Sequence, residues 1–125
     1  MKLVPSIPPR KFRVGADGHI ELTDCGHIAL APDEQVTFTT EAGGEYDVTR
    51  KEWGFYATPS LNRRLPRFGL RPALVQGLSD TVFVMLVERG HERAFDAYVA
   101  AEDLTLLRWL DDEEFLRGLR AGARG

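Results

Sequence analysis

The chain has 125 residues, of which 43% are hydrophobic and 28% charged, and its net charge is −3. That length and composition predict a single ordered domain over residues 1 to 125 and exclude a disordered or low-complexity protein. The longest apolar run, residues 82 to 87, is far shorter than the roughly 20 residues that cross a bilayer, so we expect no membrane span.

The N-terminal stretch, residues 1 to 5, lacks the apolar segment of a secretion signal, which predicts a cytoplasmic location. Cys25 is the only cysteine, so no internal disulfide can form and no set of thiolates can hold a structural zinc ion. No repeat is visible, which excludes solenoids and propellers.

Turn signals separate short β-compatible runs over the first two-thirds of the chain, at a spacing typical of an antiparallel sheet, sandwich or barrel. The Asp17-Gly18 pair predicts the turn of a hairpin, because glycine supplies the positive φ that a tight turn needs. Further turns are expected at residues 24 to 26, 32 to 34 and 42 to 44. The predicted strands cover residues 11–14, 19–24, 28–31, 35–40, 45–50, 53–58 and 67–75.

Two later strands carry more specific expectations. Pro72 has no N–H to donate, which predicts an edge position for part of strand 67–75. The run 81–87 is apolar on both faces, which is typical of a strand covered on both sides. Phe83, Met85 and Leu86 are therefore expected to be almost fully buried.

After Gly90 the apolar period changes to that of a helix over residues 91 to 102. Residues 104 to 110 suit either a strand or a helix, and their β-compatible composition favours the strand. Asp111 and Glu114 have the spacing of a capping box, which predicts a helix to about residue 120 with an inward apolar face and a frayed tail beyond. That face is expected to comprise Phe115, Leu116 and Leu119. The predicted fold is α+β: an antiparallel β-rich sheet, sandwich or partly open barrel over residues 10 to 88, then helix, strand and helix.

Charge is segregated along the chain. Residues 14 to 49 carry eight acids and no Lys or Arg, whereas residues 50 to 71 carry six basic side chains and one acid. Guanidinium groups bind phosphate or carboxylate bidentately and aromatic faces stack on rings, so this second block suits an anion that carries a ring or sugar. A nucleotide, a sugar phosphate or single-stranded nucleic acid would each fit. The predicted ligand-binding residues are Arg50, Trp53, Tyr56, Asn62, Arg63, Arg64, Arg67 and Arg71.

A structural alternative explains the same charge pattern. Basic strands commonly pair with acidic neighbours in one sheet, and the acidic block is adjacent in sequence. Cross-strand ion pairs and an anion site therefore both remain open.

Other chemistry has little support. His19, Cys25 and His27 are too few for a metal site, so we expect no metal and no cofactor. No serine lies in a Gly-x-Ser-x-Gly elbow, and neither familiar phosphate-binding glycine loop is present. The acids at 111 to 114 suit a helix start.

The stretch EYDVTRKEWGFYATPSLN, residues 45 to 62, resembles the signature segment of small uncharacterised bacterial proteins that accompany genes for cell-surface sugar assembly. The resemblance extends over residues 2 to 119. It implies no activity or catalytic residue. It implies a partner among nucleotide sugars, glycans or the enzymes that handle them, and it argues against nucleic acid.

Three functional hypotheses follow. The first is a non-catalytic binding module in surface-polysaccharide metabolism that holds an anionic sugar ligand or a partner protein. The second is a small enzyme acting on a sugar, with Tyr56, His27 or Asp47 transferring protons. The third is a structural homodimer in which Trp53 and Phe55 form the interface.

Overall fold

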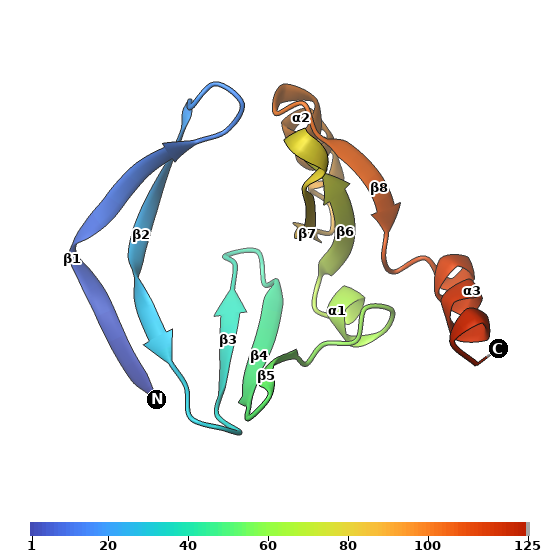
Figure 1. The fold of residues 1–125 in the computed structure, drawn as a ribbon, viewed down its shortest axis with the longest axis horizontal. Coiled ribbons are helices and arrows are strands. Elements are labelled where there is room, and N and C mark those ends of the chain that lie inside the picture. The colour runs from blue at the N-terminus through green and yellow to red at the C-terminus, as the bar shows by residue number, and fades with distance from the viewer. Residues whose placement is uncertain (125) are drawn as a thin grey trace.

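The computed structural model describes residues 1 to 124 and contains three separate antiparallel sheets (Figure 1). The predicted α+β class is confirmed, and the sheets do not close into a barrel. The elements are β1 (Lys2–Val14), β2 (Ile20–Ala29), β3 (Gln35–Thr39), β4 (Glu45–Lys51), β5 (Gly54–Ala57), α1 (Arg64–Arg67), β6 (Leu70–Gln76), η1 (Leu78–Asp80), β7 (Val82–Glu88), α2 (Glu92–Ala101), β8 (Thr105–Trp109) and α3 (Glu113–Arg124).

The first sheet is a long hairpin of β1 and β2, which we call the arm; it is the blue ribbon that stands apart in Figure 1. The predicted turn is confirmed, with the Gly18 N–H donating to the Gly15 carbonyl at 3.2 Å. The turn expected at residues 24 to 26 is wrong, because β2 continues to Ala29. Gly26 lies within the strand opposite Pro5, where its missing side chain lets β1 approach closely.

The second sheet has the order β3-β4-β5, so β4 is its central strand. Val36 pairs with Val48 and Phe38 with Tyr46, in register with the predicted alternation. The turn predicted at residues 32 to 34 is present and joins this sheet to the arm.

The third sheet has the order β7-β6-β8, so β6 is its central strand. Residues 70 to 72 pair with β7 alone, so part of the strand lies at an edge, as predicted from Pro72. The N and the C=O of one strand residue point to the same side. The Pro72 carbonyl accepts from the Leu110 N–H at 2.8 Å, and strand pairing with β8 begins only at Ala73. The Pro72 nitrogen therefore faces the end of β8, where strand pairing requires no hydrogen-bond donor. Arg67 belongs to α1 and not to the strand, whereas the predicted strand within 104 to 110 is confirmed.

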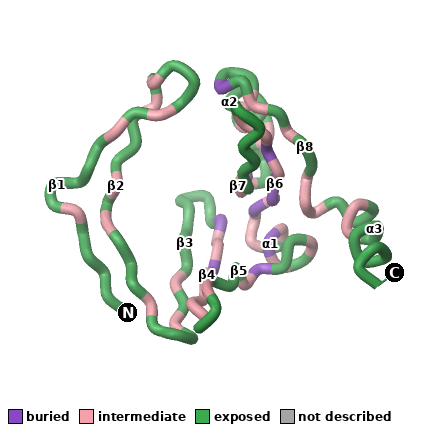
Figure 2. The backbone as a smooth tube through the Cα atoms, viewed as in Figure 1, coloured by how far each residue is buried: buried purple, intermediate pink, exposed green. Residues whose placement is uncertain are grey.

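The core is small and lies on this third sheet. Ala73, Val75 and Val87 form its buried centre, with Phe95 of α2 and Trp109 of β8 packed against it. Figure 2 shows the buried positions gathered on the body of the molecule, and no residue of the arm is buried. One thin core therefore supports the whole chain.

β7 is an edge strand of its sheet, and the exposure of its side chains contradicts the expected cover on both faces. Phe83 is 48% exposed and Val84 is 63% exposed, and Met85 and Leu86 are only partly buried. α2 packs on β7, but nothing in the described part of the chain covers its other side to the extent that the apolar sequence demands.

The C-terminal helix also departs from its prediction in detail. Asp112, not Asp111, caps α3, accepting from the Phe115 N–H at 3.1 Å. Leu119 is more than half exposed, and the helix continues through the stretch expected to fray. Within residues 1 to 124 no helix is long and apolar enough to span a membrane.

The accessible surface of the chain is 8955 Å². A compact folded monomer of 14.0 kDa exposes about 6,700 Å² by the usual scaling with mass. Large hydrophobic side chains on the arm, on β5 and on β7 contribute to the surplus. The chain thus leaves apolar surface open that a self-contained domain would bury.

We predict that Leu65→Ala lowers the free energy of unfolding by about 2 to 5 kcal/mol, because Leu65 is 1% exposed and its truncation leaves a cavity. The matched control is Leu119→Ala, at a site more than half exposed, where a change within about 0.5 kcal/mol is expected. Urea unfolding at one fixed protein concentration measures both. Equal losses would show that Leu65 is not part of the core.

Candidate functional site

Arg64, a predicted ligand-binding residue, is paired within the chain. Its guanidinium binds the carboxylate of Asp47 on β4, which is only 5% exposed. Thr37 of β3 donates a second hydrogen bond to the same carboxylate at 2.7 Å. A buried carboxylate without its cation would be strongly destabilising, so Arg64 has a structural task.

Arg71 is similarly engaged on the third sheet. It makes two hydrogen bonds to Asp111, at 3.0 and 3.3 Å, and its guanidinium carbon lies 4.0 Å from the centre of the Trp109 ring. The hydrogen bonds to Asp111 raise the pKa of Arg71 above its ordinary value. The pair with Arg71 holds Asp111 at the start of the C-terminal segment. Asp111 is therefore not free to cap α3, and the next residue, Asp112, caps it.

Two more residues of the predicted site, Arg50 and Asn62, have internal partners, as does the neighbouring Lys51. Arg50 donates to the Leu30 carbonyl at 3.2 Å, and Lys51 pairs with Asp33; both contacts hold the loop between the arm and the second sheet. Asn62 donates to Glu113 of α3 at 2.8 Å.

The remaining predicted residues are open to solvent. Arg63 and Arg67 are exposed and form no ion pair within the described residues. Trp53 is 73% exposed and Tyr56 is 51% exposed. Four of the six basic side chains of segment 50–71 therefore have partners in the chain. Only Lys51 and Arg64 pair with acids of residues 14 to 49, as the structural alternative supposes, and the exposed Arg63 and Arg67 lie at the two ends of α1.

The residues considered for proton transfer lie on three different strands. His27 is on β2 of the arm, Asp47 on β4 and Tyr56 on β5. Asp47 is already held by Arg64 and Thr37. The candidate metal ligands also have different partners. His19 binds carboxylates at the turn of the arm, whereas the Cys25 thiol lies 3.8 Å from the Thr23 carbonyl.

A second site, which the sequence analysis missed, lies where the arm's turn meets the end of α2. Glu102 is 6% exposed, and its Oε2 accepts from the Ala16 N–H at 2.6 Å. Its Oε1 lies 3.1 Å from His19 Nε2, and no described donor is aligned for a hydrogen bond with it. We call this cluster of Gly15, Ala16, His19 and Glu102 the arm latch.

Gly15 permits the close approach in the latch. Its φ is +98°, and a Cβ there would lie 3.1 Å from Glu102 Oε2. Glu102 itself was detectable in the sequence, because an acid at the C-terminal end of a helix opposes the helix dipole and needs a local reason. Here the reason is the arm.

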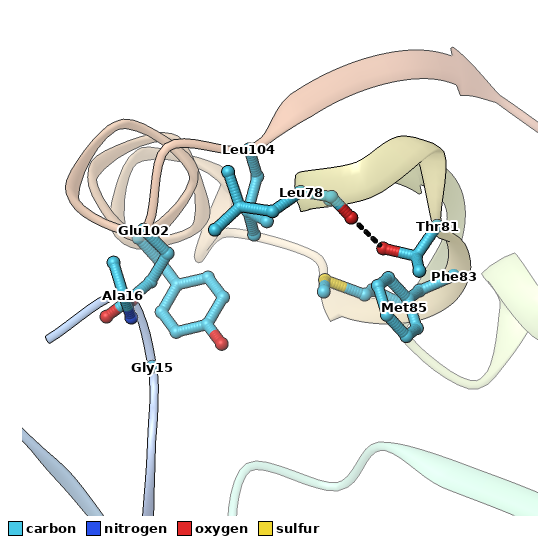
Figure 3. A pocket seen from close by; sticks show the side chains of 10 residues that line it. Gly15, Ala16, Leu78, Thr81, Phe83, Met85, Glu102 and Leu104 are labelled. Carbon is cyan, nitrogen blue, oxygen red and sulfur yellow. Dashed lines mark hydrogen bonds between the residues drawn. The ribbon is translucent and has the colours of Figure 1, made fainter. Parts of the chain in front are cut away.

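A cavity of about 410 Å³ adjoins the arm latch. Figure 3 shows Ala16 and Glu102 at one end of it and Phe83 and Met85 of β7 at the other, with Leu78 and Leu104 between. Its walls are largely apolar, so it continues the uncovered surface of β7.

The latch contains a titrating group. His19 binds Asp17 through Nδ1 and faces Glu102 through Nε2. The hydrogen bond to Asp17 raises the pKa of His19 above its ordinary value, and the charges of Asp17 and Glu102 add to the rise. A protonated His19 therefore supplies the countercharge for Glu102.

Comparison of the chain with protein-family models, with curated proteins and with solved structures found no match.

We predict that His19 titrates above its ordinary pKa of about 6.5 and that Asp17→Asn moves it back down, because Asp17 is the main cause of the shift. A raised pKa means that the contribution to arm docking is complete below that ordinary value and is lost as the pH rises through the shifted one. Side-chain NMR titration of both proteins, with the Ala16 amide as reporter of docking, measures this. Identical titrations would show that Asp17 does not tune the latch.

Proposed function

We propose that this protein is a non-catalytic binding module whose partner is another protein chain. The observation that carries the proposal is the surface of 8955 Å², against about 6,700 Å² for a compact monomer of this mass. Large exposed apolar side chains on the arm and on β7 contribute to that surplus, and exposed apolar patches are typical of protein-interaction sites.

The arm supports the same function. An isolated two-stranded hairpin is marginally stable in water unless something packs against it. The arm has no buried residue, and Ile7 near its middle is 85% exposed. A bound chain that covers the arm would provide the missing packing.

An enzymatic role has less support, because Asp47 is committed to Arg64 and the other candidate proton donors lie on separate strands. The resemblance of residues 45 to 62 to proteins that accompany surface-sugar genes supports placing the module in surface-polysaccharide metabolism. That placement is part of the proposal.

The test places a photoreactive benzoylphenylalanine at Ile7 of the arm or at Val84 of β7, in the cells from which the protein comes. Illumination is expected to give covalent protein adducts at both positions, because a bound chain lies there. The matched control is the same group at Glu41, an exposed position in the β3–β4 turn. Adducts no more abundant at Ile7 and Val84 than at Glu41 would contradict the proposal.

A second candidate function is the binding of an anionic sugar or nucleotide sugar, and the unpaired, exposed Arg63 and Arg67 favour it. Arg63→Ala and Arg67→Ala should each weaken such binding by about 1.5 to 3 kcal/mol while leaving the melting temperature of the free protein unchanged. Arg64→Ala is the contrasting variant. It leaves the buried Asp47 carboxylate without its cation and should lower the melting temperature of the free protein. A thermal-shift screen with nucleotide sugars and sugar phosphates measures both effects. If no anion stabilises the wild type, this second function is discarded.

A further inference from the structure

We propose that the chain that covers the arm and β7 is a second copy of this protein, with the arm of each copy packed against β7 of the other. The inference rests on the proposed function and names its partner. In such a two-fold dimer the contact from arm to β7 occurs twice, because each copy offers both surfaces.

The size of the uncovered surface fits a permanent dimer. The chain exposes 8955 Å², which is about 2,200 Å² more than a compact monomer of its mass. A standard interface takes about 800 Å² from each partner, and obligate homodimers take about 1,000 to 2,500 Å². The surplus therefore falls in the range of obligate partners, whose cover is present whenever the protein is folded.

The arm offers a row of exposed apolar side chains. They lie on both of its strands, and Ile7 is 85% exposed. They are Leu3, Val4, Ile7, Leu22 and Ile28. β7 offers Val82, Phe83 and Val84, and the apolar cavity beside the arm latch continues its surface.

The sequence of β7 supports the choice of this strand as the receiving surface. Residues 82 to 87 are all apolar, a pattern typical of strands buried on both faces. α2 packs against β7 from within the chain, but Phe83 and Val84, which point to opposite faces, remain 48% and 63% exposed. The sequence is thus suited to an environment that one copy does not provide.

The uncovered area favours a second copy as the occupant. Each chain carries both the arm and β7, so two copies cover both surfaces of both chains at once.

The arm is also free to take part. Outside its hinge loop, the polar contacts that tie the arm to its own body are the arm latch and the pair between the Met1 ammonium and Glu34. An arm held by so few polar contacts can pack on a neighbouring copy and lose few contacts within its own chain.

The experiment is sedimentation equilibrium of the purified full chain from 0.1 to 100 µM, with three variants. The wild type is expected to be a dimer at the upper concentrations. Ile7→Asp and Val84→Asp are expected to raise the dissociation constant at least tenfold, because each places a charge in the apolar contact. Arg93→Asp adds the same group at an exposed polar site of α2 and is expected to leave the constant unchanged.

The pairing of surfaces is checked by illuminating a mixture of unlabelled protein carrying benzoylphenylalanine at Ile7 and ¹⁵N-labelled wild type. The expected adduct joins the arm of the unlabelled chain to a ¹⁵N peptide containing β7. A monomer at 100 µM, a dimer insensitive to both Ile7→Asp and Val84→Asp, or adducts confined to one chain would overturn the inference. A monomer that still forms adducts with a different protein in cells leaves the proposed function intact, whereas a monomer with no adducts at all removes both.

Discussion

The position of the arm depends on one buried carboxylate. Glu102 is 6% exposed at the end of α2, and it binds the Ala16 N–H across a sequence separation of 86 residues. A buried carboxylate requires hydrogen bonds or a countercharge, and the arm supplies both, through Ala16 and through His19. The contact that docks the arm on the end of α2 therefore also gives Glu102 its hydrogen bond and its countercharge. Gly15 and Ala16 also line the cavity beside β7, so the same contact holds one of its walls in place.

The same rule explains segment 50–71. Its arginines read in sequence as one basic block, but burial decides what each of them does. Asp47 and Asp111 lie in places that water reaches poorly, and each draws in an arginine, Arg64 and Arg71 respectively. Arg63, next to Arg64 in the chain, has no such acid within reach and stays exposed. Some arginines of this one basic segment thus pair with largely buried acids within the fold, and others stay exposed at the surface.

The sequence predicted most of the elements because their signals are local. The Asp17-Gly18 turn, the alternation around Val36 and the helical period after Gly90 all specify structure within a few residues. The errors arose where the outcome depends on distant partners. The arm latch joins residues far apart in sequence, so its position does not follow from local pattern. Phe83 was expected to be buried because its strand is apolar, and a single chain does not supply the cover.

An uncovered arm exposes strand edges that can pair with one chain after another, so a feature of the arm has to prevent unlimited pairing. Edge strands invite further strands through their free N–H and C=O groups, and prolines and charges are the usual means of preventing it. β1 carries Pro5, Pro8 and Pro9, which remove three donors, followed by Arg10, Lys11 and Arg13. Its backbone is thus a poor template for continued sheet growth, while Leu3, Val4 and Ile7 keep its side chains apolar. The arm is therefore suited to association through side-chain packing, which ends once both copies are covered, and not to edge-to-edge pairing, which does not end.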